Sequence, residues 1–170
     1  MIGRRPARLF GLTTLLTCAT VAAVSAQSFM ATVIAVHDGD TISVRTASAT
    51  ERIRLVGIDC PEYRQPYSAR AKRFTSDLVF GRQVRVEPHG RDRYDRLLAR
   101  VVVEGTDVNE ALVRQGYAWQ YAIGAPDTRL EAAERAARDA RLGLWADPRP
   151  VPPWQWRREH PDRERVPGKR

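Results

Sequence analysis

The stretch that decides the fold is residues 30–58, MATVIAVHDGDTISVRTASATERIRLVGI. Its first part, residues 30–37, is apolar and rich in β-branched side chains, which predicts a strand. An Asp-Gly pair at residues 38–39 signals a tight turn, and the polar and apolar alternation of residues 41–45 predicts the returning strand. Residues 52–57 place arginines on one face of a third strand and apolar residues on the other. The stretch therefore predicts a curled antiparallel meander.

The sequence after the meander alternates between helix and strand patterns. Residues 68–80 have apolar side chains at helical spacing, followed by a glycine that can end the helix. Two further strands are expected at residues 83–87 and 97–103. Two C-terminal helices are expected as well, one opened by the capping-box-like run Asp107–Glu110 and ended by Gly116, the other running from Thr128 to Leu142. This order predicts an α+β fold, a five-stranded OB-fold β-barrel with one helix between strands 3 and 4 and two C-terminal helices.

The two ends of the chain differ from this body, residues 27–147. Residues 1–26 combine a cationic start, an apolar run and a small-residue cleavage motif, which predicts a signal peptide and a secreted or periplasmic protein. The alternative is a permanent membrane anchor, disfavoured by the threonines that interrupt the run. Residues 148–170 are rich in proline and arginine, which predicts an extended or disordered tail. Trp154 and Trp156 would either pack the start of this tail onto the body or stack on bases.

Composition bounds the class of protein. The 170 residues are 43% hydrophobic and carry a formal charge of +8, which disfavours both a disordered chain and a membrane bundle. The excess positive charge lies in the leader and the tail, because the body holds nearly equal numbers of basic and acidic residues. Overall charge is therefore weak evidence for a nucleic-acid partner. After removal of the leader, Cys60 is the single cysteine left, so the core or a bound ion has to stabilise the fold without an internal disulfide.

Three acidic side chains are expected near one end of the barrel. Asp40 follows the hairpin turn, and Asp59 and Glu62 lie in the loop that leaves the third strand. If the meander curls, the hairpin and this loop meet. Oxygen ligands of this kind suit Ca²⁺ or Mg²⁺ and disfavour zinc or a redox metal. Taken singly, each acid has a structural alternative: Asp40 would favour the turn, and Glu62 would be a solvated loop acid.

Two arginines extend the acidic group. Arg54 shares the exit of its strand with Asp59, and Arg96 stands directly before the strand at residues 97–103. A guanidinium binds phosphate through two parallel hydrogen bonds and stays protonated at any working pH. Carboxylates, a cation and paired arginines that meet at one point form a set suited to phosphodiester hydrolysis. The cation and the arginines offset charge growing on the phosphoryl oxygens, and a carboxylate positions or deprotonates water.

Four motifs stand in order along the chain. They are His37-Asp-Gly-Asp-Thr41, Arg54-Leu-Val-Gly-Ile-Asp-Cys-Pro-Glu62, Asp92-Arg-Tyr-Asp-Arg96 and Val108-Asn-Glu-Ala-Leu-Val-Arg-Gln-Gly116. Their order and spacing resemble those of the staphylococcal nuclease (thermonuclease) family, over roughly residues 30–147. Four motifs in order are far more specific than any one of them. The ending Val151-Pro-Pro-Trp-Gln-Trp-Arg157 is also similar to the tail of bacterial relatives.

The resemblance implies an exported, Ca²⁺-dependent, sugar-nonspecific endonuclease that hydrolyses phosphodiester bonds of DNA and RNA and leaves 3′-phosphate ends. Asp40 and Asp59 would bind Ca²⁺ through their carboxylates. Cys60, where the family usually has threonine, would bind it through the backbone carbonyl. Glu62 would hold the attacking water as the general base. No stable protein partner is implied, and a monomer is expected.

The same resemblance assigns the residues that contact nucleic acid. Arg54 and Arg96 would be catalytic, contacting the scissile phosphate and stabilising its five-coordinate transition state. Arg93 and Tyr94 match positions that contact a terminal phosphate of bound nucleotide. Tyr121 is the candidate for a base-stacking tyrosine.

Two residues lead to other hypotheses. Asp95 replaces a glycine common in the family and would pair off Arg96 if it pointed inward. It favours a second hypothesis, a catalytically weak or inactive OB-fold module that binds nucleic acid or protein without cutting. A third hypothesis makes Cys60 a nucleophile, with His37 or His89 as its base. The alternative for that thiol is a small, partly buried side chain without a chemical role.

Overall fold

The computed structural model describes residues 27–121 and 127–161. The predicted signal peptide, residues 1–26, and the end of the predicted tail, residues 162–170, lie outside the described residues. Within the described ranges, no helix has both the length and the apolar character needed to cross a membrane.

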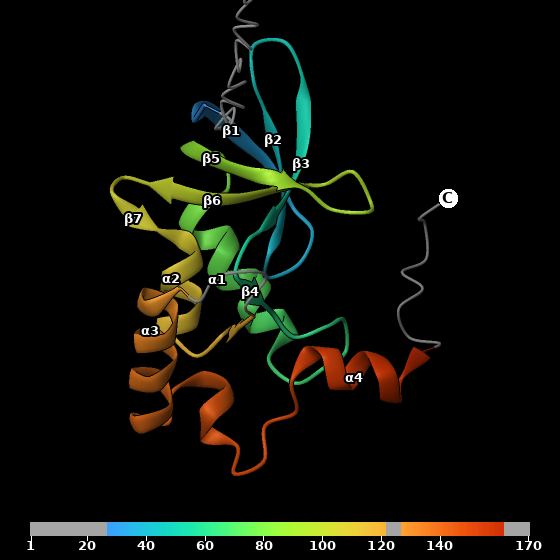
Figure 1. Ribbon diagram of the computed structural model, residues 1–170, viewed down its shortest axis with the longest axis vertical. Helices are drawn as coiled ribbons and strands as arrows, with labels where there is room; N and C mark the ends of the chain where they lie inside the picture. The colour runs from blue at the N-terminus through green and yellow to red at the C-terminus, as the bar shows by residue number, and fades with distance from the viewer. Residues whose placement is uncertain (1–26, 122–126, 162–170) are drawn as a thin grey trace, which may run out of the picture.

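Five strands form a closed barrel, which lies at the top of Figure 1. β1 (Phe29–Val36) pairs antiparallel with β2 (Thr41–Arg45), and β2 pairs antiparallel with β3 (Thr50–Leu55), as the predicted meander requires. β5 (Gln83–Arg91) pairs with β1 and with β6 (Leu97–Val103). A parallel pairing between β3 and β6 closes the barrel. Together with the helices described next, this barrel confirms the predicted α+β OB-type fold.

Three helices cover the lower end of the barrel (Figure 1). α1 (Ser68–Val79) lies between β3 and β5 in the chain, where one helix was expected. α2 (Val108–Arg114) packs against α1, β6 and α3 (Thr128–Asp139). All three helices occur where the sequence predicts them. Gly116 follows the cap of α2 in a left-handed conformation, as expected of the residue that ends this helix, whereas α3 ends before the predicted residue.

The helix ends follow local side-chain chemistry. The Asp107 carboxylate accepts the backbone N–H of Glu110 at 3.1 Å, as the capping-box pattern predicts for α2. α3 begins at Thr128 as predicted, and the residue that caps it is Asp127, whose side chain accepts the N–H groups of Arg129 and Leu130. The predicted end of α3 at Leu142 is wrong. The helix stops at Asp139 because Arg141 adopts a left-handed backbone conformation with φ of 52°.

Short elements that the sequence does not predict complete the body. β4 (Ile58–Asp59) pairs antiparallel with β8 (Trp119–Gln120), which ties the loop after β3 to the C-terminal half of the chain. β7 (Thr106–Asp107) turns back and pairs antiparallel with the end of β6, and the 3₁₀ helix η1 (Gly143–Ala146) follows α3. Two-residue strands carry no measurable alternation, so their sequence gives no strand signal.

The start of the predicted tail is ordered, which corrects that prediction. α4 (Pro153–Glu159) begins at a proline whose fixed φ suits the first turn of a helix. Trp154 packs on the body, with its ring centroid 5.6 Å from Trp119 and 5.5 Å from Tyr121. Of the two alternatives for this tryptophan, the structure supports packing. Trp156 stacks on His160 within the same segment, at 3.9 Å.

The core has two parts. The larger lies inside the barrel and against α1 to α3, and includes Ile53 and Leu55 of β3, which are at most 1% exposed. This burial confirms the predicted apolar face of that strand and leaves Arg54 on the opposite face. The smaller part is an aromatic group around Trp119 and Trp145, against which α4 packs.

Candidate active site

The hairpin turn after β1 and the loop after β4 are packed directly together. The backbone N–H of Cys60 donates to Oδ2 of Asp40 at 2.7 Å. The Thr75 hydroxyl of α1 donates to the Gly39 carbonyl at 2.6 Å, which anchors the turn to this helix. A Cβ at Gly39 would lie 2.7 Å from both Cβ and Sγ of Cys60, so this position has no room for a side chain. The meeting of hairpin and loop agrees with the sequence expectation.

One guanidinium joins the two buried carboxylates of this region. Asp40 and Asp59 are each 1% exposed. Arg54, on the polar face of β3, donates through Nη1 to Oδ1 of Asp40 and through Nη2 to Oδ1 of Asp59, the latter at 2.6 Å. The two carboxylates therefore converge on a single positive group, which offsets part of the cost of burying their charge.

Glu62 lies at the edge of the same group. Its backbone N–H donates to Oε1 of Gln65 at 2.9 Å, and Nε2 of Gln65 donates to the Val151 carbonyl at 2.7 Å. Burial raises the pKa of Glu62, and the neighbouring Arg157 guanidinium opposes this shift. Gln65, itself buried, thus connects the Glu62 loop to the segment that precedes α4.

Arg157 of α4 is a member of the site that the sequence does not predict. It donates through Nη2 to Oδ2 of Asp59 at 3.0 Å and through Nη1 to Oε1 of Glu62 at 2.5 Å. These bonds to carboxylates outweigh the effect of burial and raise the pKa of Arg157. Its only sequence signal is the ending Val151-Pro-Pro-Trp-Gln-Trp-Arg157, whose prolines favour an extended tail.

Arg96, Arg93 and Tyr94 form a second group on the loop between β5 and β6. Arg96 donates through Nε to Oδ2 of Asp92 at 2.7 Å, so its bonded partner is Asp92 and not Asp40 or Asp59. Asp92 also accepts the N–H groups of Tyr94 and Arg96 through Oδ1. Burial acts to raise the pKa of Asp92, but these hydrogen bonds outweigh it and hold that pKa below its usual value. The carboxylate fixes the fold of the loop.

The two groups are carried by neighbouring strands. Ile53 of β3 lies opposite Leu97 of β6 in the parallel pairing, so Arg96 directly precedes the strand that lies beside the one carrying Arg54. The Tyr94 ring is 65% exposed, with the guanidinium carbons of Arg93 and Arg96 at 4.8 Å and 5.5 Å from its centroid. The loop thus presents an exposed aromatic ring flanked by two cations.

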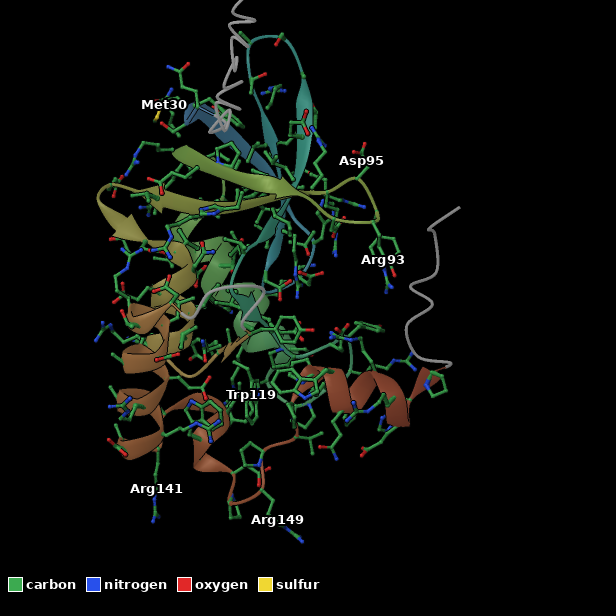
Figure 2. The ribbon with its side chains drawn as sticks, in the orientation of Figure 1. Met30, Arg93, Asp95, Trp119, Arg141 and Arg149 are labelled. Carbon is green, nitrogen blue, oxygen red and sulfur yellow. The ribbon has the colours of Figure 1, made fainter. Side chains whose placement is uncertain are left out.

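Asp95 does not pair off Arg96. Its backbone is left-handed, with φ of 60°, and its side chain is 88% exposed, with Oδ1 3.5 Å from Arg91. Figure 2 shows Asp95 and Arg93 on opposite sides of the loop, with Arg93 directed toward the side on which α4 lies. Asp95 therefore does not weaken the site by pairing with Arg96. The partner of Arg96 is Asp92.

Tyr121 and Cys60 complete the predicted set. Tyr121 is 38% exposed and packs against Trp154, so it belongs to the aromatic side of α4 and not to the Arg93–Tyr94 group. Cys60 is buried, and burial raises the pKa of its thiol well above the usual value, which disfavours the thiolate. His37 is engaged with Ser43 at 2.8 Å, and His89 is exposed. These contacts oppose the hypothesis of a cysteine nucleophile.

The donor set fits a hard divalent cation. Asp40 and Asp59 supply carboxylate oxygens that already converge on one cationic group, and Ca²⁺ prefers such oxygens together with backbone carbonyls and water. Across the described ranges, no group of three or more His, Cys, Asp and Glu side chains gathers as a metal site would. Asp40 and Asp59 are therefore two carboxylates, fewer than the six to eight oxygen ligands that Ca²⁺ takes.

Comparison with known proteins supplies the family context. The model of the family described as "Staphylococcal nuclease homologue" matches residues 52–147. The chain is 42% identical over 142 residues to Protein ParB of Escherichia coli, covering 77% of this chain and 80% of that protein. It is 44% identical over 126 residues to an uncharacterized endonuclease of Escherichia coli, covering 74% and 82%. It is 39% identical over 141 residues to a micrococcal nuclease of Shigella flexneri, covering 76% and 81%.

Proposed function

The chain belongs to the staphylococcal nuclease family, and from this premise we propose that it is an exported, Ca²⁺-dependent endonuclease. It hydrolyses phosphodiester bonds of DNA and RNA and leaves 3′-phosphate ends. Family membership, with relatives named as endonucleases and as a micrococcal nuclease, supports a nuclease function. The observation that carries the finer proposal is the convergence of two buried carboxylates, Asp40 and Asp59, on one guanidinium, Arg54.

The carboxylates would hold the metal ion. Asp40 and Asp59 contribute carboxylate oxygens, and Cys60 contributes its backbone carbonyl. Bound there, Ca²⁺ supplies positive charge that offsets the charge developing on the phosphoryl oxygens. Replacement of threonine by cysteine leaves this backbone ligand intact, because the carbonyl does not depend on the side chain.

The remaining side chains act on the phosphate and on water. Arg54 and Arg96 donate hydrogen bonds to the non-bridging oxygens and stabilise the five-coordinate transition state. Glu62 orients the attacking water and accepts its proton. The water oxygen bonds to phosphorus, the bond to the 5′ oxygen breaks and that oxygen takes a proton from solvent, so the phosphate stays on the 3′ side.

Weak sequence selectivity follows from the type of contact. Arginine contacts to phosphates position a strand without reading its bases. The exposed Tyr94 ring, flanked by Arg93 and Arg96, offers a face on which any base can stack. This arrangement favours single-stranded or locally opened nucleic acid of either sugar type.

One observation favours a second candidate, a catalytically weak or inactive module that binds nucleic acid. Arg96 is bonded to Asp92 at 2.7 Å. In a binding module this pair would persist when nucleic acid is bound. In the nuclease, phosphate would compete with Asp92 for the guanidinium.

The decisive experiment incubates the purified protein with heat-denatured DNA and with RNA, in Ca²⁺, in Mg²⁺ and in a chelator. We expect cleavage in Ca²⁺, loss of cleavage in the chelator, and products that carry 5′-hydroxyl groups accessible to kinase labelling. An Asp40→Asn variant is the matched control, since it keeps the size of the side chain and removes one proposed ligand. Cleavage at an unchanged rate in the chelator would contradict the ion-dependent mechanism, and binding without cleavage would support the second candidate.

Export is tested separately. N-terminal sequencing of the protein recovered from the medium or the periplasm should begin at Gln27. Recovery of the uncleaved chain in membranes would favour the anchor instead.

A further inference from the structure

The C-terminal helix brings a second guanidinium, beside that of Arg54, to the acidic group. Arg157 lies 98 residues beyond Asp59 in the chain, yet it bonds both oxygens of that carboxylate, Nη1 to Oδ1 at 3.3 Å and Nη2 to Oδ2 at 3.0 Å. The same Nη1 donates to Oε1 of Glu62. One planar group thus joins a proposed metal ligand to the proposed water-binding carboxylate.

The helix that carries Arg157 is held to the body by independent contacts. Pro153 at its first turn is buried, and Trp154 packs between Trp119 and Tyr121. The Val151 carbonyl just before the helix accepts Nε2 of Gln65, whose Oε1 accepts the N–H of Glu62. The Glu62 loop is therefore bonded to the α4 segment through its backbone as well as through its carboxylate.

We propose that Arg157 is a positioning residue for hydrolysis, which holds the Glu62 carboxylate in a fixed relation to Asp59. This inference rests on the proposed function and deepens it. Arg54 does not take this part in the structure, where its two terminal nitrogens are bonded to Asp40 and Asp59. In the described chain, the side-chain hydrogen bond that reaches the Glu62 carboxylate comes from Arg157. Without it, this carboxylate keeps its loop but loses its orientation.

The charges of the group agree with a positioning role. Asp40, Asp59 and Glu62 contribute three negative charges, and Arg54 and Arg157 contribute two positive charges. The group keeps a net negative charge, which attracts a divalent cation even with Arg157 in place. A bidentate guanidinium fixes the angle between its acceptors, which an ammonium group does not.

The test compares Arg157→Ala and Arg157→Lys with Arg158→Ala. Arg158 is the exposed neighbour on the same helix, so its loss controls for charge and helix content. For Arg157→Ala we expect kcat on denatured DNA to fall by about 10–100-fold, the usual effect of losing such a supporting bond, with little change in KM. Arg157→Lys should be intermediate. Methylguanidinium, far below concentrations that unfold the protein, should raise the rate of Arg157→Ala and leave Arg158→Ala unchanged.

Ca²⁺ binding, measured by calorimetry, separates positioning from loss of the metal ligands. Arg157→Ala should bind Ca²⁺ at least as tightly as the parent, because Asp40 and Asp59 remain and a competing cation has gone. A parental kcat in Arg157→Ala would overturn the inference. So would a faster rate, which would make the contact an inhibitory latch, and so would joint loss of Ca²⁺ binding and activity.

Folding and the fate of the proposed function are checked in the same series. If circular dichroism shows that Arg157→Ala is unfolded, the inference is tested on Arg157→Lys instead. A parental kcat in Arg157→Lys would then overturn the positioning role of the guanidinium. If the parent cleaves and Arg157→Ala cleaves equally, the inference alone fails. If the parent does not cleave with any ion, the proposed function fails and the inference falls with it.

Discussion

The backbone N–H of Cys60 donates to Oδ2 of Asp40 at 2.7 Å, so the two segments that carry the buried acids are bonded to each other directly. The bond uses the backbone of residue 60, and it is therefore independent of the side chain there. The bond also holds one oxygen of the Asp40 carboxylate, while the Arg54 guanidinium bonds the other oxygen. The acidic group is preorganised by the fold, which lowers the cost of assembling it around an ion or a phosphate.

Replacement of Arg54 should affect both catalysis and stability. We expect Arg54→Ala to lower kcat by about 10²–10³-fold, the usual cost of losing one preorganised donor. Without Ca²⁺, the variant should also lose roughly 3–5 kcal/mol of unfolding free energy, because two buried carboxylates lose their partner. Arg45→Ala, at the exposed end of β2, is the control. Parental cleavage by a folded Arg54→Ala protein would remove Arg54 from the mechanism.

Calcium should stabilise the folded protein measurably. An ion that binds only the folded state adds about 2.7 kcal/mol at a concentration 100 times its Kd. We expect the parental Tm to rise with Ca²⁺ in differential scanning calorimetry, and the rise to shrink strongly in Asp59→Asn. Equal rises in the parent and in Asp59→Asn would place the bound ion elsewhere.

The cap of α3 can be tested by a pair of adjacent substitutions. Asp127→Ala removes the side chain that accepts two helix N–H groups and should cost about 1–2 kcal/mol, whereas Thr128→Ala should be nearly neutral. Urea unfolding at neutral pH measures both. A larger loss of stability in Thr128→Ala than in Asp127→Ala would contradict Asp127 as the cap.

The contribution of Asp127 should also depend on pH. Burial acts to raise its pKa, but hydrogen bonds from Arg129 and Arg100 outweigh it and hold the folded-state pKa below its usual value. Its stabilisation is therefore complete above the unfolded pKa of about 3.9 and is lost as pH falls through the lower folded value. The stability difference between Asp127→Ala and the parent should shrink in that acidic window. A constant difference there would mean that ionisation of Asp127 contributes nothing.

The loop before β6 offers a contrast between two acids. Asp95→Gly should leave the cleavage rate unchanged and shift stability by less than about 0.5 kcal/mol, because the side chain is exposed and faces Arg91. Asp92→Ala should lower the rate, because Arg96 loses the carboxylate that orients it. A faster Asp95→Gly enzyme would show that Asp95 acts on the phosphate site after all.

The barrel could be predicted from sequence because its signals are local. The Asp-Gly turn and the alternation around Ile53 and Leu55 define the meander within thirty residues, and both apolar residues are buried as expected. The meeting of Asp40 and Asp59 follows from that meander. The partner of Arg96 was missed, although Asp92 is only four residues away, because the loop holds several acids and sequence spacing does not say which one folds inward.

The contribution of α4 could not be predicted for a different reason. Prolines at 150, 152 and 153 lower the local preference for regular structure, and the helix depends on burial of Trp154 against Trp119 and Tyr121. Those partners lie more than thirty residues away in the chain. Because tertiary packing and not local propensity decides this segment, Arg157 remained outside the predicted site.

The parallel pairing of β3 with β6 has a consequence for folding kinetics. It joins Ile53 to Leu97 across a long intervening chain, so the barrel closes only after a large loss of loop entropy. Arg54 lies on the strand at this seam, and Arg96 directly precedes the other. The two arginines are therefore brought together late, and a chain trapped with an open seam would hold most of its secondary structure while remaining unable to cut.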